Sequence, residues 1–145
     1  MDDILIRRLK PEDAHDICMI DAAITQETEN IDYRRMIEEQ AYKTEDASFV
    51  AEFRGVVVGY MISYILSGGF GMEKSAWIAI LGVDPKFMGQ GIGKRLAEEI
   101  FRFYEDKKIN TIYTSVRWDS TDLLSFFKTL GFDRSDFINL RKHIH

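Results

Sequence analysis

Three glycines separated by single residues, Gly89, Gly91 and Gly93, constrain the fold of this chain more than any other feature. Neither a helix interior nor a strand suits three glycines so close, because each loses much backbone entropy when it is ordered. Residues 76–83, before them, are almost wholly apolar over too short a run for a typical helix, which predicts a buried strand. Residues 91–106 place apolar side chains at helical spacing. We therefore expect the glycines at a turn where a helix opens.

A glycine-rich helix start is suited to binding an anion. The first backbone N–H groups of a helix are unpaired and lie at the positive end of its dipole, and without side chains they can come close to a phosphate. The spacing excludes two common phosphate-binding motifs. A dinucleotide fingerprint needs glycine where the chain has Lys94, and a P-loop needs glycine at Met88 and a hydroxyl at Arg95. A plain glycine-rich turn is the alternative without a ligand.

The stretch at residues 83–96, VDPKFMGQGIGKRL, resembles the acetyl-CoA signature of the GNAT superfamily of N-acetyltransferases. The matching residues are Val83, Pro85, Gly89, Gly91, Ile92 and Gly93. Met88 departs from the signature, since the family usually has Arg or Gln there. A second stretch at residues 120–132, STDLLSFFKTLGF, resembles a later signature of the same family. That run and the pair at residues 116–117 are similar to the N-terminal-amine acetyltransferases that modify ribosomal proteins.

Composition bounds the class of protein. A chain of 145 residues, 46% hydrophobic and 30% charged, suits one globular domain, and the resemblance implies that residues 1–145 form a single acetyltransferase domain. The net charge of −5 offers no basic field for nucleic acid or an anionic membrane, and no apolar run reaches membrane-span length. The single cysteine, Cys18, excludes a disulfide framework within the chain and indicates the cytoplasm. The histidines and Cys18 show no metal-binding spacing, so no metal site is expected.

Hydrophobic periodicity predicts the element order β-α-α-β-β-β-α-β-α-β-β. This order gives an α/β fold (an α+β mixed sheet) with helices on both faces. The last two strands are expected at residues 132–134 and 138–142. The resemblance implies the same architecture, a GNAT-like acyl-CoA N-acyltransferase fold whose sheet is splayed open where its fourth and fifth strands part. In that fold the cofactor lies in the wedge between the two strands.

The resemblance also implies acetyl-CoA as co-substrate. The residues expected to contact it are Leu81, Gly82, Val83, Met88, Gly89, Gln90, Gly91, Ile92, Gly93, Lys94, Ser120 and Phe127. Ser120 replaces an asparagine that is usual in the family, and Phe127 stands where relatives usually have the tyrosine that protonates the thiolate. Phenylalanine cannot donate a proton, so Tyr113 on the fifth strand, or Tyr64 on the third, is a candidate substitute. Packing roles for both tyrosines stay open.

The groups that would handle the acyl transfer itself are less evident. By resemblance, the backbone N–H near Val83 should polarise the thioester carbonyl. Many relatives carry a base, a glutamate, on the fourth strand or on the fifth, where this chain has Ser115. Residues 76–83 contain no carboxylate. Glu73 and Asp84, which flank that strand, are candidate bases acting through water, and a solvated surface role stays open for each.

These features predict an N-acetyltransferase that transfers an acetyl group from acetyl-CoA to a primary amine by direct attack in a ternary complex. The amine could belong to a small molecule, a peptide or a protein, and is expected to enter beside residues 22–31, 67–72 and 133–137. A non-catalytic acyl-CoA-binding sensor or regulatory module is the alternative. A nucleotide-binding α/β domain is a third, which the failed fingerprints disfavour. Many relatives pair, so a homodimer is expected.

Overall fold

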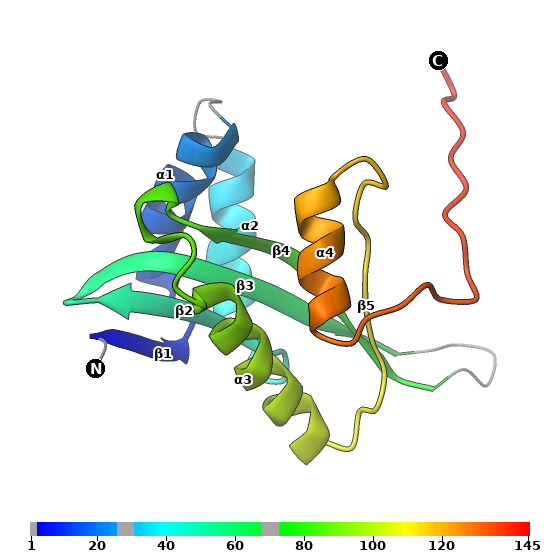
Figure 1. The fold of residues 1–145 in the computed structure, drawn as a ribbon, viewed down its shortest axis with the longest axis horizontal. Coiled ribbons are helices and arrows are strands. Elements are labelled where there is room, and N and C mark those ends of the chain that lie inside the picture. The colour runs from blue at the N-terminus through cyan, green and yellow to red at the C-terminus, as the bar shows by residue number, and fades with distance from the viewer. Residues whose placement is uncertain (1–2, 26–30, 68–72) are drawn as a thin grey trace. The chain divides into compact units, whose positions relative to one another are not determined.

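The computed structural model describes residues 3–25, 31–67 and 73–145, and the chain falls into two compact units, Met1–Ser115 and Val116–His145. The first unit holds most of the regular structure (Figure 1). Its elements are β1 (Ile4–Arg8), the 3₁₀ turn η1 (Pro11–Asp13), α1 (Ala14–Thr25), α2 (Ile31–Ala41), β2 (Ser48–Phe53), β3 (Val56–Leu66), β4 (Ser75–Val83), the 3₁₀ turn η2 (Pro85–Phe87), α3 (Ile92–Asp106) and β5 (Ile112–Thr114). The predicted order of elements is confirmed over this unit.

The strands form one mixed sheet in the order β1-β2-β3-β4-β5. The pairs β1–β2, β2–β3 and β3–β4 are antiparallel, and β5 runs parallel to β4 after the crossover through α3. Arg54 and Gly55 join β2 to β3 with φ of 51° and 85°. Two positive φ angles in a two-residue turn match the right-handed twist of the strands, which explains the tight hairpin.

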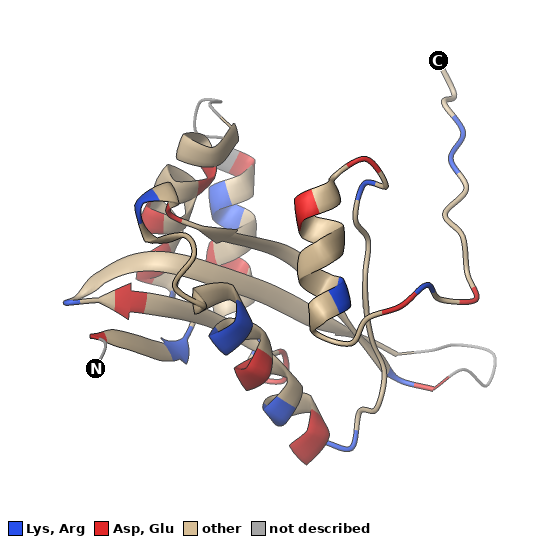
Figure 2. Ribbon diagram, viewed as in Figure 1, with Lys and Arg blue, Asp and Glu red and all other residues tan. Residues whose placement is uncertain are grey.

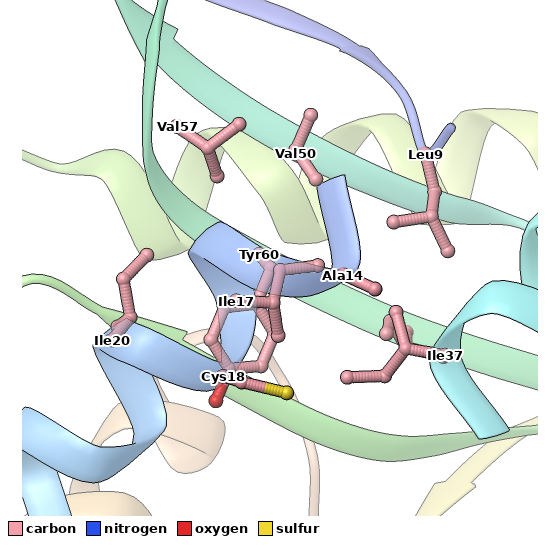
Figure 3. Close-up of a cluster of buried hydrophobic side chains, with 10 residues drawn as sticks. Leu9, Ala14, Ile17, Cys18, Ile20, Ile37, Val50, Val57 and Tyr60 are labelled. Carbon is pink, nitrogen blue, oxygen red and sulfur yellow. The ribbon is translucent and has the colours of Figure 1, made fainter. Parts of the chain in front are cut away.

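Helices cover both faces of this sheet, as predicted. On one face, α1 and α2 pack on β3 through a buried cluster that includes Ile17, Ile37 and Tyr60 (Figure 3). On the other face lies α3, whose Tyr104 hydroxyl is 2.6 Å from the Ser63 hydroxyl of β3. Successive residues of a strand point to opposite faces, so β3 supplies side chains to both helical layers. From Gly59 to Leu66 this alternation assigns each residue of β3 to a face.

Acidic and basic side chains are interspersed along α3 (Figure 2). Such mixing gives that helix no field of one sign to attract a polyanion. Among the described residues, no group of three or more His, Cys, Asp or Glu side chains is arranged to hold a metal ion. Within the same residues, no helix combines the length and the apolar character needed to cross a bilayer.

The second unit contains α4 (Thr121–Thr129). Gly131, with φ of 95°, follows the helix, and the Phe132 N–H donates to the Phe127 carbonyl at 3.0 Å while the Gly131 N–H donates to the Lys128 carbonyl at 3.0 Å. These two bonds form a Schellman cap, which satisfies carbonyls that the helix end would leave unpaired. The predicted helix and its glycine stop are confirmed.

The two closing strands predicted at residues 132–134 and 138–142 are wrong: the structure assigns neither helix nor strand from residue 132 to 145. At the first position, the Phe132 N–H serves the helix cap and its ring packs 5.1 Å from that of Phe127. At the second, Ile138 and Leu140 are 71% and 87% exposed. A strand exists only through its ladder of hydrogen bonds, so alternating residues alone do not make one.

Candidate functional site

The strands β4 and β5 part soon after they meet. They pair only over three positions, from Ala76 with Ile112 to Ile78 with Thr114. Strand β4 then continues through residues 79–83 while still paired with β3. Along those residues, no strand in the described part of the chain pairs with the other edge of β4. The backbone groups on that edge can therefore pair with an extended ligand.

A β-bulge at Ala79 decides which residues face this open edge. The Ala76 N–H donates to the Thr111 carbonyl at 3.1 Å, toward β5, whereas the Asp84 N–H donates to the Val58 carbonyl at 2.8 Å, toward β3. Residues an even number apart in a regular strand would point their N–H groups the same way. The register skips Ala79 between the partners of the β3–β4 ladder, and this extra residue reverses the alternation.

Because of the bulge, the N–H and carbonyl of Leu81 and Val83 point away from β3, toward the open edge. Gly82, between them, pairs with Tyr60 of β3. The geometry thus gives Leu81 and Val83 the orientation that binding the amides and carbonyl of an acyl-CoA arm requires. Gly82 contributes differently: a Cβ atom there would lie 2.7 Å from the Tyr60 hydroxyl and 2.8 Å from its ring. Only glycine lets Tyr60 pack against this part of β4.

The start of α3 packs against the sheet at the Val83 end of β4. Gly59 of β3 pairs with Val83, and a Cβ atom on Gly59 would come within 2.9 Å of the Ile92 Cγ2 atom. The absence of that side chain lets the first residue of α3 approach the sheet closely. Ile92 is 2% exposed, so the contact belongs to the core. The helix start is therefore fixed relative to the open edge of β4.

The glycine loop has the conformation that the sequence predicted. Gly89 and Gly91 have φ of 81° and 77°, and a Cβ atom on either would meet no other atom within 4 Å. Gly91 is the N-cap of α3, and the first helical bond runs from the Arg95 N–H to its carbonyl at 3.1 Å. No side chain in the described ranges caps this 15-residue helix. The amides of residues 91–94 thus precede the first bonded amide of the helix and have no partner within it, which fits a phosphate group.

The side chains around this loop are mostly in solvent. Met88, Gln90 and Lys94 are exposed, with Met88 at 59%. Arg95 turns away, since one of its guanidinium nitrogens donates to the Ile4 carbonyl of β1 at 3.2 Å. Asp84 caps η2 by accepting from the Lys86 N–H at 3.0 Å. Of the two cations in the first turn of α3, Lys94 and Arg95, Lys94 is the one whose exposure lets it reach a bound phosphate.

The structure does not bring the two other candidate catalytic residues, Glu73 and Tyr113, to the Val83 end of β4. Glu73 lies exposed before the first residue of β4, and ten residues of extended chain span about 30 Å to Val83. Tyr113 is paired with Trp77 of β4, their rings stacked with centroids 4.9 Å apart. Six residues of strand separate Trp77 from Val83, a distance of about 20 Å. Neither side chain can touch a group bound at Val83.

Two expected contact residues belong to the second unit. Ser120 is the N-cap residue of α4, although its side chain makes no capping hydrogen bond. Phe127 is 3% exposed and lies between Phe126 and Phe132, with ring centroids 5.2 Å and 5.1 Å away. The Phe127 ring therefore has a packing role within its unit. Parts of the expected acceptor entrance, residues 26–30 and 68–72, lie outside the described residues.

Sequence reasoning missed a pair of tyrosines behind the open edge. Tyr33 of α2 and Tyr60 of β3 share a side-chain hydrogen bond. Burial and then the charge of Asp21 raise the pKa of Tyr33 to about 12, and burial raises the pKa of Tyr60 further. Both phenols are therefore neutral near pH 7 and cannot serve as bases there. Strand alternation in the sequence indicates that Tyr60 projects from one face of the sheet. Its contact with Gly82 becomes evident only from the register of β3 and β4.

Comparison with known proteins agrees with this geometry. The family model described as the acetyltransferase (GNAT) family matches residues 14–132. A mycothiol acetyltransferase of Amycolatopsis mediterranei is 32% identical over 79% of this chain, and the N-alpha-acetyltransferase RimI of Mycobacterium tuberculosis is 34% identical over 45% of it. This chain spans 37% of the length of each. It therefore aligns with only a part of both relatives.

The fold has close counterparts among solved structures. An aminoglycoside N-acetyltransferase, AAC(6')-Iy, crystallised in complex with CoA, superposes with a TM-score of 0.81 over 98% of this chain and 95% of that one, at 17% sequence identity. At that identity the likeness establishes the fold alone. Because the family model covers most of the chain, the assignment does not depend on this superposition. The chain belongs to the acetyltransferase (GNAT) family.

Proposed function

We propose that this protein transfers an acetyl group from acetyl-CoA to a primary amine, by direct attack of the amine in a ternary complex. One observation carries the proposal: the uncapped, glycine-rich start of α3 lies at the same end of β4 as the open edge formed by Leu81 and Val83. An anion site next to a free strand edge suits a ligand with a phosphorylated head and an amide-bearing arm. Coenzyme A has both parts.

The loop would hold the pyrophosphate through backbone donors. Gly89 and Gly91 adopt left-handed φ angles in open space, so the loop presents its amides without side chains over them. The N-terminus of α3 adds its dipole. Lys94, exposed in the first turn, supplies a mobile positive charge. Met88 adds no charge where relatives usually have Arg or Gln, so the backbone bears most of the binding.

The edge of β4 would hold the arm and the reacting carbonyl. Leu81 and Val83 point their N–H groups outward, where they can pair with the amides of an extended arm as an added strand does. Acetyl-CoA supplies an activated acyl thioester. An N–H group aimed at its carbonyl oxygen would stabilise the negative charge that grows there as the amine attacks. We assign this role to Val83.

Proton transfer is the step for which this chain offers the fewest candidate residues. An alkylamine with a pKa near 10 is mostly protonated at pH 7 and must lose a proton before it attacks. Strand β4 carries no carboxylate, Glu73 lies at its far end, and Asp84, which follows Val83, accepts from the Lys86 N–H as the cap of η2 and is expected to act only through water. Water is therefore the proposed proton acceptor. It follows that kcat/KM should rise about tenfold per pH unit below the pKa of the acceptor amine, because only the neutral amine reacts.

The missing acid and base favour a second candidate, a non-catalytic acyl-CoA sensor. Phe127 has no proton to donate, and Ser115 stands where many relatives have a carboxylate. The sensor would share the loop and the open edge but would release no thiol. A cytoplasmic location and pairing as a homodimer stay predictions for either candidate.

A thiol-release assay distinguishes the two candidates. The purified chain is mixed with acetyl-CoA and a panel of amines, which includes small polyamines, an aminoglycoside, an amino sugar and a peptide with a free N-terminus. Free CoA thiol is followed with a disulfide reagent, and each acetylated product is identified by its mass increase. The enzyme proposal predicts amine-dependent thiol release. CoA binding without release on any amine would favour the sensor.

A further inference from the structure

Three aromatic side chains form a row across adjacent strands of the sheet. Tyr64 of β3 pairs in register with Trp77 of β4, and Trp77 pairs with Tyr113 of β5. Directly paired residues project from the same face of a sheet. The Trp77 and Tyr113 rings are stacked, with centroids 4.9 Å apart and planes inclined by 26°. All three side chains are half-buried, so each presents part of its surface to solvent. We call these residues the aromatic row.

The aromatic row lies on the face opposite α3. Ser63 precedes Tyr64 and points toward α3, since its hydroxyl contacts that of Tyr104. The next residue of the strand must point to the other face, the one that α1 and α2 cover at Tyr60 and Ile62. The aromatic row continues that face, beyond the fully buried cluster. Its position makes it a partly open extension of a packed core.

The aromatic row also adjoins the place where β4 and β5 part. The last paired position is Ile78 with Thr114, whose hydroxyl donates to the Ile78 carbonyl at 3.0 Å. One residue on, the bulge at Ala79 begins the stretch that leads to Leu81 and Val83. Four residues of strand place Trp77 about 13 Å from Leu81. A molecule of modest length can therefore reach from the open edge to these rings.

The chemistry of the rings indicates what they would bind. The faces of Trp and Tyr carry negative electrostatic potential and attract ammonium groups, by more where water is partly excluded. Glu73 and Lys74, which precede β4, bring one charge of each sign to this end of the strand, and the Asp46 carboxylate accepts from the Ile65 N–H of β3 at 3.0 Å. The aromatic rings would then determine which kind of ligand is preferred at this end of the strand. An acceptor amine is itself an ammonium ion near neutral pH.

We propose that the aromatic row binds an ammonium group of an acceptor that carries at least two amino groups. The other amino group, which is acetylated in its neutral form, lies at the Leu81–Val83 edge. This inference rests on the proposed function and narrows it to diamines and polyamines, including amino-substituted rings, whose nitrogens can lie about 13 Å apart. It gives Tyr113 a role in binding rather than in proton donation. Long acceptors should be acetylated faster than short ones.

The test compares α,ω-diaminoalkanes of increasing length with monoamines of the same chain lengths. The monoamines measure the contribution of the hydrocarbon chain, so their difference from the diamines isolates the second ammonium group. Wild-type kcat/KM should rise with diamine length and reach a maximum, which the monoamines lack. Trp77→Leu and Tyr113→Leu should lower the diamine value at that maximum by roughly 3- to 30-fold relative to the matched monoamine. Trp77→Phe and Tyr113→Phe should retain most of it.

Two controls separate the role of the rings from folding. Phe103, a half-buried aromatic of α3 whose ring lies 6.3 Å from that of Phe49, gives the matched variant Phe103→Leu outside the aromatic row. It should leave the ratio of diamine to monoamine kcat/KM unchanged. CoA-induced thermal stabilisation should be the same in every variant. Equal loss on diamines and monoamines, or no dependence on diamine length in the wild type, would overturn the inference alone. Turnover of no amine would overturn the proposed function and this inference with it.

Discussion

Individual glycines in this chain serve two different physical purposes. Gly59 and Gly82 are needed because another side chain occupies the space of a Cβ atom, 2.9 Å and 2.7 Å away. Gly89 and Gly91 have open space around them and are needed for their left-handed backbone. Substitution at the first pair should disturb packing. Substitution at the second pair should change the loop and leave the core intact.

Gly91→Ala should weaken CoA binding by about 5- to 30-fold while the protein stays folded. The new methyl group meets no neighbour, but alanine disfavours a φ of 77°, by about 1–2 kcal/mol. The loop should relax and misalign its amides. Gly55→Ala is the matched control, since Gly55 has φ of 85°, equally open space and a place in the β2–β3 turn. Calorimetric titration should give Gly91→Ala a Kd for CoA about 5- to 30-fold higher than that of the control, and equal affinities would contradict the placement of the phosphate site.

The hydrogen-bonded pair of Tyr33, which is half-buried, and Tyr60, which is buried, predicts a loss of stability at alkaline pH. The pKa of Tyr33 is raised to about 12 in the folded chain, against about 10 when unfolded, so folding favours the protonated phenol. That contribution is fully present below pH 10 and is lost as the pH rises through 12. Tyr33→Phe removes this titration. Its urea midpoint should therefore fall less than that of the wild type between pH 9 and pH 11.5, and equal falls would show that Tyr33 does not titrate as described.

At the scale of elements, the site depends on how one strand and one helix are joined. The bulge at Ala79 turns Leu81 and Val83 toward the open edge, and the close approach at Gly59 seats the first turn of α3 beside them. Both set the relative position of the phosphate site and the strand edge, so packing changes should alter binding indirectly.

Gly59→Ala should weaken CoA binding without altering any residue of the loop. The added methyl would lie 2.9 Å from the Ile92 Cγ2 atom, so the start of α3 must shift away from β3. Overpacking of this kind destabilises a protein by about 1–3 kcal/mol. Ile92→Ala in the same chain removes the clash and should restore part of the affinity. If Gly59→Ala alone leaves CoA affinity unchanged, the packing of α3 against β3 does not control the phosphate site.

The sequence predicted the strand, the glycine loop and α3 because each has a local signature: an apolar run, glycine spacing and helical periodicity. It could not show the bulge at Ala79, which exists only in the combined register of β3, β4 and β5. It also suggested Glu73 as a base from its nearness to β4. An extended strand carries its two ends far apart, so a residue that flanks one end is remote from the other.

For the whole molecule, the fold agrees with the family while the last segment departs from prediction. The two expected closing strands had the right alternation, yet a strand requires a partner edge that local sequence does not encode. The expectation of a single domain over residues 1–145 stays a prediction beside the two compact units, Met1–Ser115 and Val116–His145. Family membership follows from a match over residues 14–132, which extends into both units.

The proposal that the glycine loop and β4 bind CoA is tested most directly by measuring the thermal stability of the purified protein with CoA, acetyl-CoA, ATP and NAD in turn. A ligand that binds only the folded chain adds about 2.7 kcal/mol at a concentration 100 times its Kd, a rise in Tm on the order of 5–10 °C for a chain of this size. We expect this rise with CoA and acetyl-CoA alone, and a smaller rise in Gly91→Ala at the same ligand concentration. No rise with either CoA species would mean that the glycines form only a turn.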